Sequence, residues 1–519
     1  MKQNGLTRRD FLKLLGVGSL LAPASRFIHL TENEQPSADP ATQPNIIILL
    51  FDTLSAHHMS LYGYQRKTTP NIDLFAKPST VFYRHYASSN FTHPSTASLL
   101  TGVYPWSHRA LNFYTEMLKY FTKSNIFSKL NSDFFTQTYT HNEFVMTILE
   151  QFKCNIDSLV PVEELTTYNP NGFPNSFQND YPMGFYATKR WREEYIGPSS
   201  SLFLNPIFEV METISSSNIQ KANAEQYPLG LSDNQEKYIF RLEDAIDWIA
   251  KSVISAPQPY FGYFHLLPPH EAYRPRKDFL GKFSNDGLVL TEKPEHFFSK
   301  GQTHQQLREF RDKYDEYIAF VDAEFGRLFR TLEENKALEN TYFILTSDHG
   351  QLFERGIHGH GITLFEPLTH IPLIIHAPGQ SQGKKVFTPT SITDIMPTVL
   401  KLANKELPSW MEGKLLPTFN GKHETERTIF SVDGRENAKL KPLTKATLSA
   451  VHWPYKLIHY RGYSGLNNID ELFNLENDPQ ELDNIAAHRP STVADLKHEI
   501  HQYQLTAEKR ALGSSINQN

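Results

Sequence analysis

Three short apolar runs along the chain end abruptly in polar residues that can carry chemistry. These runs, each with the polar residues that follow it, are Ile46–Phe51 with Asp52, Tyr342–Leu345 with Asp348 and His349, and PYFGYFHLLPPH with His265 and His270. Uninterrupted apolar runs are typical of strands that are buried on both faces of a largely parallel sheet. Because ligands bind at the carboxyl ends of such strands, the pattern predicts that these polar side chains surround a ligand site.

The rest of the chain supplies helices and a second, smaller sheet. Apolar residues recur every three or four positions over Leu307–Leu332, which predicts one long amphipathic helix. Residues from about 157 to 235 are polar and rich in proline and asparagine, which indicates an insertion at the substrate mouth. Over 406–505 short strands and a final helix predict an antiparallel sheet with a helical cover, and a loose end after Leu505. The predicted fold is α/β, with a large, mostly parallel central sheet flanked by helices over residues 40–405.

The first 24 residues have the pattern of a bacterial export signal. TRRDFLK precedes an apolar run, Leu14–Leu21, that is too short to span a membrane and ends in small residues. The paired arginines indicate the twin-arginine type, which predicts a periplasmic, extracellular or envelope-associated protein. The alternative is a basic amphipathic N-terminus. No later stretch is long and apolar enough to span a bilayer, although an uncleaved signal would tether the chain.

Charge and cysteine content narrow the class of protein further. The export signal carries a net charge of +3, so its removal takes the chain from −6 to −9. An acidic protein of this kind is not expected to bind nucleic acid. The one cysteine, Cys154, excludes an internal disulfide, which agrees with folding before export.

Asp52, Thr92, Asp348 and His349 form the set of residues best suited to catalysis. Two carboxylates and an imidazole are ordinary ligands of a divalent cation, and a hydroxyl beside that cation loses its proton readily. Each residue also has a structural interpretation: Asp52 as a helix cap, His349 as a hydrogen-bonded loop histidine, and Thr92 as the N-cap of a helix that begins near position 94. Because a helix N-terminus also stabilises anions, Thr92 can be a cap and a nucleophile at once.

Eight stretches, in order along nearly the whole chain after the export signal, resemble one known family. They are IIILLFDTLSAHHMSLYGY, TTPNIDLFA, THPSTASLLTGVYPWSH, FHLLPPHEAYRP, YDEYIAFVDAEFGRLFRTLEE, TSDHGQLFERGIHGHGITLFEPLTHIPLIIHAPG, SITDIMPTVLKLA, and YKLIHY with DELFNLENDPQELDNIA. The family that they resemble is the sulfatase branch of the alkaline phosphatase superfamily. The resemblance implies an alkaline-phosphatase-like α/β sandwich with a small C-terminal antiparallel subdomain.

The resemblance also assigns roles to individual residues. Asp52 is similar to the family's first metal aspartate, and Asp348 with His349 to its later metal pair, which is Asp-Asn in many sulfatases and Asp-His in many phosphate-cleaving relatives. His270 is similar to a histidine that contacts the substrate oxyanion or leaving group. His360 lies where relatives place a lysine or histidine that faces the same anion, with His358 as the alternative.

One further match and several departures bear on the chemistry. His108 is similar to a recurrent histidine that supports the site. Thr92 and Thr96 stand where sulfatases have a formylglycine precursor and its anchoring arginine, Thr53 replaces a second aspartate, and residues 138–142 hold no lysine-x-histidine match. Threonine cannot become formylglycine and has no second hydroxyl to expel sulfate by elimination. Its covalent intermediate needs a second nucleophilic attack on the central atom, which is routine for phosphorus.

We therefore expect a metal-dependent hydrolase that cleaves phosphate mono- or diesters through Thr92 and a covalent intermediate. The alternatives are a sulfuric ester hydrolase that works without formylglycine, a phosphoryl transferase with an alcohol acceptor, and an inactive relative that binds anions. The expected partners are an anionic ester substrate and one Zn²⁺, Mn²⁺, Ca²⁺ or Mg²⁺ ion, and one imidazole favours zinc or manganese. His270 and His360 are the expected ligands of any second ion, and otherwise one of them protonates the leaving group.

Overall fold

The computed structural model describes residues 43–167, 214, 216–234, 238–284, 286–419, 421–424, 426–466 and 468–516. Its centre is an eight-stranded sheet in the order β13-β2-β12-β9-β1-β8-β4-β5. These strands are β13 (Lys384–Val386), β2 (Thr80–Phe82), β12 (Leu373–His376), β9 (Thr341–Thr346), β1 (Asn45–Phe51), β8 (Tyr260–Leu266), β4 (Phe135–Thr140) and β5 (Ser158–Leu159). Strand β12 runs antiparallel to both of its neighbours and every other pairing is parallel, which confirms the predicted mostly parallel sheet.

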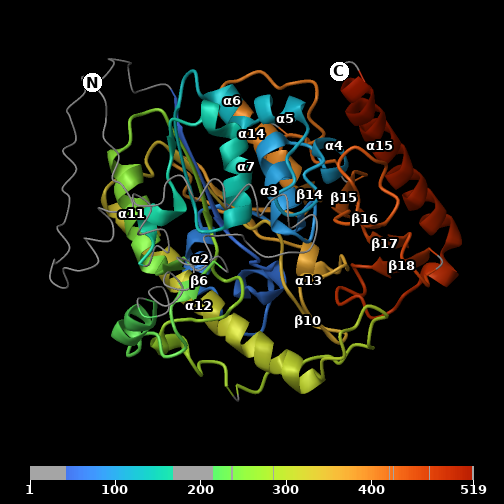
Figure 1. Cartoon of the computed structure of the whole chain (residues 1–519), viewed down its shortest axis with the longest axis horizontal. Helices are drawn as coiled ribbons and strands as arrows, with labels where there is room; N and C mark the ends of the chain where they lie inside the picture. Colours follow the sequence, from blue (N-terminus) through green and yellow to red (C-terminus); the bar gives the residue numbers. More distant parts are fainter. Residues whose placement is uncertain are drawn as a thin grey trace, which may run out of the picture. The chain divides into compact units, whose positions relative to one another are not determined.

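The central strand β1 is apolar on both faces because each face packs against its own layer of helices. Ile46, Ile48 and Leu50 belong to one core cluster, with residues of α3, α6, α7 and α14. The residues between them belong to a second cluster, with residues of α2, α11 and α12. The two helical layers lie on opposite sides of the sheet (Figure 1). Each large side chain buried in this way stabilises the fold by about 1.5–3 kcal/mol.

The helices have the following bounds. They are α2 (Pro70–Ala76), α3 (Thr92–Thr101), α4 (Pro105–His108), α5 (Lys119–Lys123), α6 (Ile126–Leu130), α7 (Glu143–Phe152), α11 (Leu242–Ser255), α12 (His304–Glu334), α13 (Glu366–Thr369), α14 (Ile395–Leu402) and α15 (Pro490–Ile516). Helix α12 confirms the long amphipathic helix that the spacing predicts over Leu307–Leu332. It begins with a capping box, in which the Thr303 hydroxyl accepts from the Gln306 N–H, and this extends it one turn beyond the periodic residues.

A separate four-stranded antiparallel sheet follows, as predicted. Its strands, in spatial order, are β15 (Thr428–Asp433), β16 (Ala446–His452), β17 (Tyr455–Arg461) and β18 (Ile469–Asn474). One face packs against α15 and α4, and the other packs against the segment that contains α13. The expected loose end after Leu505 is wrong, because α15 continues to Ile516. Ala507 is buried and Glu508 accepts a hydrogen bond from the Leu443 N–H, so the loop before β16 holds the helix beyond Leu505.

Three short strand pairs complete the described secondary structure. They are β3 (His85–Tyr86) with β14 (Thr390–Ser391), β6 (Ser232–Asp233) with β7 (Ile239–Phe240), and β10 (Leu352–Glu354) with β11 (Ile357–Gly359). The expected export signal, and residues 168–213 of the expected insertion, lie outside the described residues, and the domain boundaries stay predictions. Among the helices of the described ranges, none combines the length and the apolar character that crossing a bilayer requires.

Candidate active site

Two strand ends bring the predicted metal ligands together. Strands β1 and β9 are parallel neighbours, so Asp52 after β1 and the pair Asp348 and His349 after β9 emerge at the same edge of the sheet. One candidate ligand atom from each of the three residues lies within 4.8 Å of the others. All three side chains are fully buried. The arrangement agrees with the ligand set expected from the sequence.

Hydrogen bonds fix both carboxylates and leave one oxygen of each free. Asp348 Oδ1 accepts from the backbone N–H of Thr53 at 3.1 Å and of His349 at 2.9 Å. Asp52 Oδ2 accepts from the Asn142 side-chain amide at 2.6 Å. Asp52 Oδ1 and Asp348 Oδ2 are buried and have no hydrogen-bond partner among the described residues. Buried carboxylate oxygens without partners are costly, and a divalent cation is the partner that suits them.

The third ligand, His349, is oriented for the same role. Its Nδ1 lies 2.9 Å from the carbonyl oxygen of Gly350, which accepts a hydrogen bond only if Nδ1 carries the proton. The lone pair is therefore on Nε2, which faces Asp348 Oδ2 at 3.5 Å. Donation of one ring N–H to a backbone carbonyl is the usual way in which proteins orient a metal-binding histidine. The residues present thus fit a divalent cation.

Thr92 lies beside this cluster, at the N-terminus of α3. Its Oγ1 is 3.2 Å from His349 Nε2. The Ser95 hydroxyl, one turn later, donates to the carbonyl oxygen of Asp348 at 2.6 Å and holds the start of the helix against the metal-ligand loop. The expectation that Thr92 caps a helix beginning near position 94 is wrong: α3 begins at Thr92 itself, and Phe91 is the N-cap residue. The Thr92 hydroxyl makes no capping bond and points to His349 instead.

His108 supports α3 from behind. Its Nδ1 accepts from the Ala110 N–H at 3.1 Å, so Nε2 carries the proton and lies 3.1 Å from the carbonyl oxygen of Pro94 and 3.0 Å from the Ser98 hydroxyl. Burial lowers the pKa of His108 to about 3, which keeps the ring neutral. The residue therefore holds the first turns of the helix that carries Thr92.

His270 and His360 meet next to the cluster. Their Nε2 atoms are 3.2 Å apart, and the ring of His360 lies 4.6 Å from that of His349, measured between centroids. His270 Nδ1 is 2.7 Å from the carbonyl oxygen of Glu271, so Nδ1 carries a proton and Nε2 accepts from His360. The alternative residue, His358, stacks on Phe310 at 4.0 Å instead. The geometry therefore favours His360 over His358.

The pKa shifts follow from burial and from these neighbours. Burial alone raises the pKa of Asp52, but the hydrogen bond from His265 and the nearby charges of His270, His265 and His349 outweigh it and hold the pKa below its ordinary value. Burial, assisted by His349 and His270, holds the pKa of His360 well below its ordinary value. An ionised Asp52 and a neutral His360 are the expected states at neutral pH.

Two further residues contact Asp52: His265, which the sequence places at a strand end beside the ligand site without a specific role, and Asn142, which sequence reasoning missed. His265 Nε2 is 3.3 Å from Asp52 Oδ2, and the side chain is fully buried at the end of β8, next to β1. Its position at a strand end was the available signal. Asn142 caps α7 through its Oδ1 and donates to Asp52 through Nδ2. It lies in the segment without the family's lysine-x-histidine match, so nothing in the sequence marked it.

Thr53, which replaces a family aspartate, has a strained backbone. Its φ of 59° is in the left-handed region, which β-branched residues rarely adopt. The conformation aims its N–H at Asp348, and the Tyr314 hydroxyl holds it by donating to the Thr53 carbonyl oxygen at 2.5 Å. Strain of about 1–3 kcal/mol at a functional site persists only where surrounding contacts enforce it.

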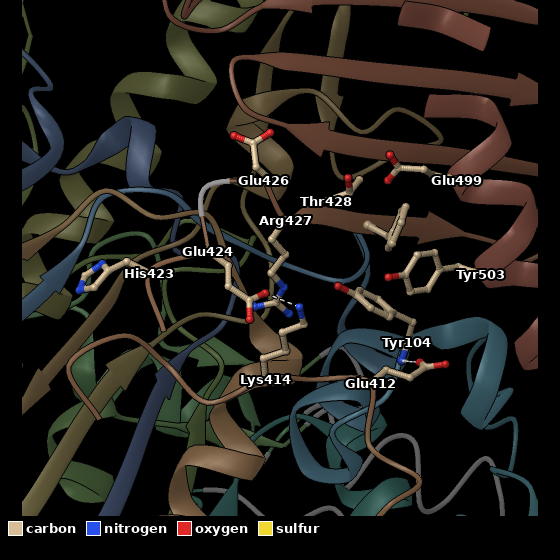
Figure 2. A pocket seen from close by; sticks show the side chains of 11 residues that line it. Tyr104, Glu412, Lys414, His423, Glu424, Glu426, Arg427, Thr428, Glu499 and Tyr503 are labelled. Atoms are coloured by element: carbon tan, nitrogen blue, oxygen red, sulfur yellow. Dashed lines mark hydrogen bonds and ion pairs between the residues drawn. The ribbon is translucent and has the colours of Figure 1, made fainter. Parts of the chain in front are cut away.

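A cavity of about 420 Å³ lies elsewhere, beside the antiparallel sheet (Figure 2). It shares no residue with the cluster around Asp52. Arg427 binds both carboxylate oxygens of Asp394, and Lys414 pairs with Glu424, so these cations of the cavity are already neutralised. Figure 2 shows Lys414 and Glu424 pointing toward each other. The cavity is therefore a poor site for an anionic ester.

Fold and site together define a class of protein. A mostly parallel sheet between two helical layers is an alkaline-phosphatase-like fold, and here ligand-type carboxylates and an imidazole lie at its central strand ends. Within this class the assignment is narrower. The sequence model of the Sulfatase family matches residues 44–405, and the chain belongs to this family. A second model, for the C-terminal part of N-sulphoglucosamine sulphohydrolase, matches residues 357–509.

Characterised relatives agree with this assignment. The chain is 27% identical over 295 residues to Arylsulfatase K of Homo sapiens, an alignment that covers 50% of this chain and 54% of the relative. It is 25% identical over 470 residues to Choline-sulfatase of Rhizobium meliloti (strain 1021), over 86% of this chain and 82% of the relative. The chain thus spans about half of Arylsulfatase K and most of Choline-sulfatase.

Solved structures share the fold at low sequence identity. The Phosphonate Monoester Hydrolase of Agrobacterium radiobacter superposes with a TM-score of 0.62 and 18% identity, covering 90% of this chain and 96% of that chain. BT1596, a 2-O GAG sulfatase, superposes with a TM-score of 0.60 and 18% identity, covering 90% and 93%. One architecture therefore serves enzymes named for phosphonate esters and for sulfate esters, so the fold does not decide between them.

Proposed function

We propose that this protein is a metal-dependent hydrolase of phosphate mono- or diesters, with Thr92 as the nucleophile. The observation that carries the proposal is the position of Thr92 Oγ1, 3.2 Å from His349 Nε2 and at the N-terminus of a ten-residue helix. Asp52, Asp348 and His349, with Thr92 as a further ligand, would hold a divalent cation, whose positive charge would favour loss of the hydroxyl proton and offset the charge of the ester.

The side chains have the following roles in catalysis. Thr92 gives its hydroxyl proton to solvent and its Oγ1 attacks the phosphorus, while the N–H groups of the first turn of α3 stabilise the added negative charge. The bond to the ester leaving group breaks, and the leaving oxygen takes a proton from the doubly protonated ring of His270, whose Nε2 carries the second proton. Water next attacks the phosphorus from the opposite side and gives one proton to His270. The phosphate is released, and Thr92 Oγ1 takes a proton back from solvent.

His270 is the better proton donor of the two histidines. Its Nδ1–H is anchored on the carbonyl oxygen of Glu271, which aims Nε2 toward His360. His360 stays neutral because burial and its neighbours lower its pKa. Its Nε2–H donates to His270 Nε2 in the structure, and it can donate to a substrate oxygen instead once His270 Nε2 carries a proton. With two or more imidazoles near the cation, zinc or manganese suits the site better than calcium or magnesium.

The test compares aryl phosphate monoesters, phosphodiesters and sulfates as substrates, with and without a chelator. We expect phosphate turnover to exceed sulfate turnover and to vanish on chelation. Thr92→Ala should lower kcat by about a thousandfold or more, as loss of a nucleophile does. After an acid quench with radiolabelled phosphate ester, peptide mapping should find phosphothreonine at position 92.

Thr101→Ala is the matched control. Thr101 lies on the same helix, is equally buried, and its hydroxyl bonds only the carbonyl oxygen of Ala97. Its replacement should leave kcat within a few-fold of the parent. Full activity of Thr92→Ala, or a labelled residue other than Thr92, would contradict the proposed nucleophile.

Cleavage of sulfate esters is the second candidate function, and family membership is the observation that favours it. Relatives carry the names Arylsulfatase K and Choline-sulfatase. In that case Thr92 would have to be freed by water attacking sulfur, because threonine offers no elimination route. A sulfate turnover that exceeds phosphate turnover in the same assay decides for this candidate.

We also propose that the protein is exported through its twin-arginine-type signal. TRRDFLK supports this, and the single cysteine agrees with a chain that folds before export. Replacing Arg8 and Arg9 by lysine should retain the protein in the cytoplasmic fraction of a bacterial host. Unchanged export of that variant would contradict the proposal.

A further inference from the structure

A second cluster of ligand-type side chains lies apart from the catalytic residues. It consists of His57, Glu366 and His370, and one candidate ligand atom from each lies within 4.8 Å of the others. The rings of His57 and His370 meet edge to face at 5.4 Å, and His370 Nδ1 is 3.9 Å from Glu366 Oε2. We propose that these three residues form a second divalent-metal site, of the kind that takes Zn²⁺.

His370 is held in the tautomer that such a site needs. Its Nε2 is 3.0 Å from the carbonyl oxygen of Tyr83, which can only accept, so Nε2 carries the proton. The lone pair is left on Nδ1, the atom that faces Glu366. This bond from the outer ring nitrogen to a backbone carbonyl is the same device that orients His349 at the first site.

Glu366 is held through its other oxygen. Lys456 Nζ binds Glu366 Oε1 at 2.8 Å, which leaves Oε2 toward His370. Lys456 is fully buried and also binds Glu481 at 3.0 Å. Burial raises the pKa of Glu481 to about 7, so its charge adds to that of Glu366 mainly above neutral pH. The ammonium and the metal ion would occupy different oxygens of Glu366.

The donor set and the exposure indicate the class of metal. Two imidazoles and one carboxylate are a recurrent set of protein ligands for Zn²⁺, with a fourth position left for water. Glu366 is buried, whereas His57 and His370 are partly exposed, so an ion can reach the site from solvent. Hard cations such as Ca²⁺ and Mg²⁺ prefer oxygen ligands and should bind weakly here.

The site would link two segments that are far apart in the sequence. His57 belongs to the short 3₁₀ helix η1 (Ala56–His58), which follows Asp52, and the other two ligands lie at the two ends of α13. The segments already touch, since the Ala56 N–H donates to the carbonyl oxygen of His370 at 3.1 Å. A bound ion would add a bond across this junction and stabilise the loop that carries Asp52.

The test counts metal ions on the intact chain in which the catalytic site has been disabled. Asp348→Asn removes a ligand of the first site. Equilibrium dialysis against Zn²⁺ with elemental analysis should then find one equivalent on Asp348→Asn and two on the parent. Adding His57→Ala should raise the Kd of the remaining Zn²⁺ by more than the 10–100-fold that loss of a supporting contact causes. Co²⁺ in place of Zn²⁺ should lose its intense tetrahedral absorption in the same variant.

His304→Ala is the matched control, because His304 is an exposed histidine at the start of α12. Added to the Asp348→Asn chain, it should leave the one bound equivalent of Zn²⁺ in place. The proposal would be overturned if the Asp348→Asn chain binds no Zn²⁺. It would also be overturned if the Asp348→Asn, His57→Ala chain still binds one equivalent with undiminished affinity. Neither outcome bears on Thr92, since the measurement is made on a chain without the catalytic metal.

Discussion

Removal of the catalytic cation should destabilise the whole fold, and not only abolish activity. Without the cation, Asp52 Oδ1 and Asp348 Oδ2 are buried oxygens that lack hydrogen-bond partners among the described residues. Each such oxygen costs about 1–3 kcal/mol, and more when it is charged. The cation offsets this cost only in the folded state, because the unfolded chain does not hold the two strand ends together. Chelation should therefore lower the unfolding temperature.

The size of the effect follows from mass action. A cation present at about a thousandfold its Kd stabilises the folded state by about 4 kcal/mol. The described residues from 43 onward form one compact unit, and at about 2.1 cal/mol/K per residue their unfolding entropy is about 1 kcal/mol/K. Chelation should thus lower Tm by about 4 °C. Differential scanning calorimetry of the loaded and the chelated protein measures this, with the His57→Ala chain used throughout to exclude the second proposed site.

The variant Asp348→Asn should be less stable than the parent with metal but not in chelator. Its side-chain oxygen can still accept from the N–H groups of Thr53 and His349, as Asp348 Oδ1 does, while an amide replaces the unpartnered Oδ2. In chelator the variant should be at least as stable as the parent, and with metal it should be less stable. The assignment of these ligands would be refuted if metal still raises the Tm of Asp348→Asn. It would also be refuted if metal does not raise the Tm of an active parent.

Three further predictions concern Thr92, His108 and His265. Thr92→Ser should retain turnover within about tenfold, because serine offers the same hydroxyl at the same atom, and steady-state kinetics checks this. His108, with its pKa lowered to about 3, stays neutral in the fold while the unfolded ring protonates below its ordinary value of 6.5. The free energy of unfolding should therefore fall by up to about 1.4 kcal/mol per pH unit as the pH drops below about 6.5. His108→Gln should reduce this fall, which urea unfolding at pH 7.5 and 5.5 measures. His265→Gln should weaken Mn²⁺ binding about 10–100-fold in calorimetric titration, since His265 Nε2 fixes Asp52.

The parts of the site that the sequence predicts are those that sit at strand ends. A run such as Ile46–Phe51 is apolar at every position because both faces are buried, and this marks a central parallel strand without knowledge of its partners. Asp52 and the Asp348 pair then fall at the same edge by topology alone. The same reasoning places the long helix α12, whose period of 3.6 residues needs only one buried face. These features depend on local pattern, which is why they could be read from the chain.

The features that escaped prediction depend on how distant segments approach each other. Asn142 reaches Asp52 from a helix cap across strand β8, and no local pattern distinguishes it from an ordinary cap. His57 and Glu366 are 309 positions apart and meet only because α13 packs against η1. Single histidines and glutamates in such segments are common, so they can be recognised as ligands only after the fold has brought them together. A metal count on the Asp348→Asn chain therefore tests what the fold adds to the sequence, because the second site has no local motif of its own.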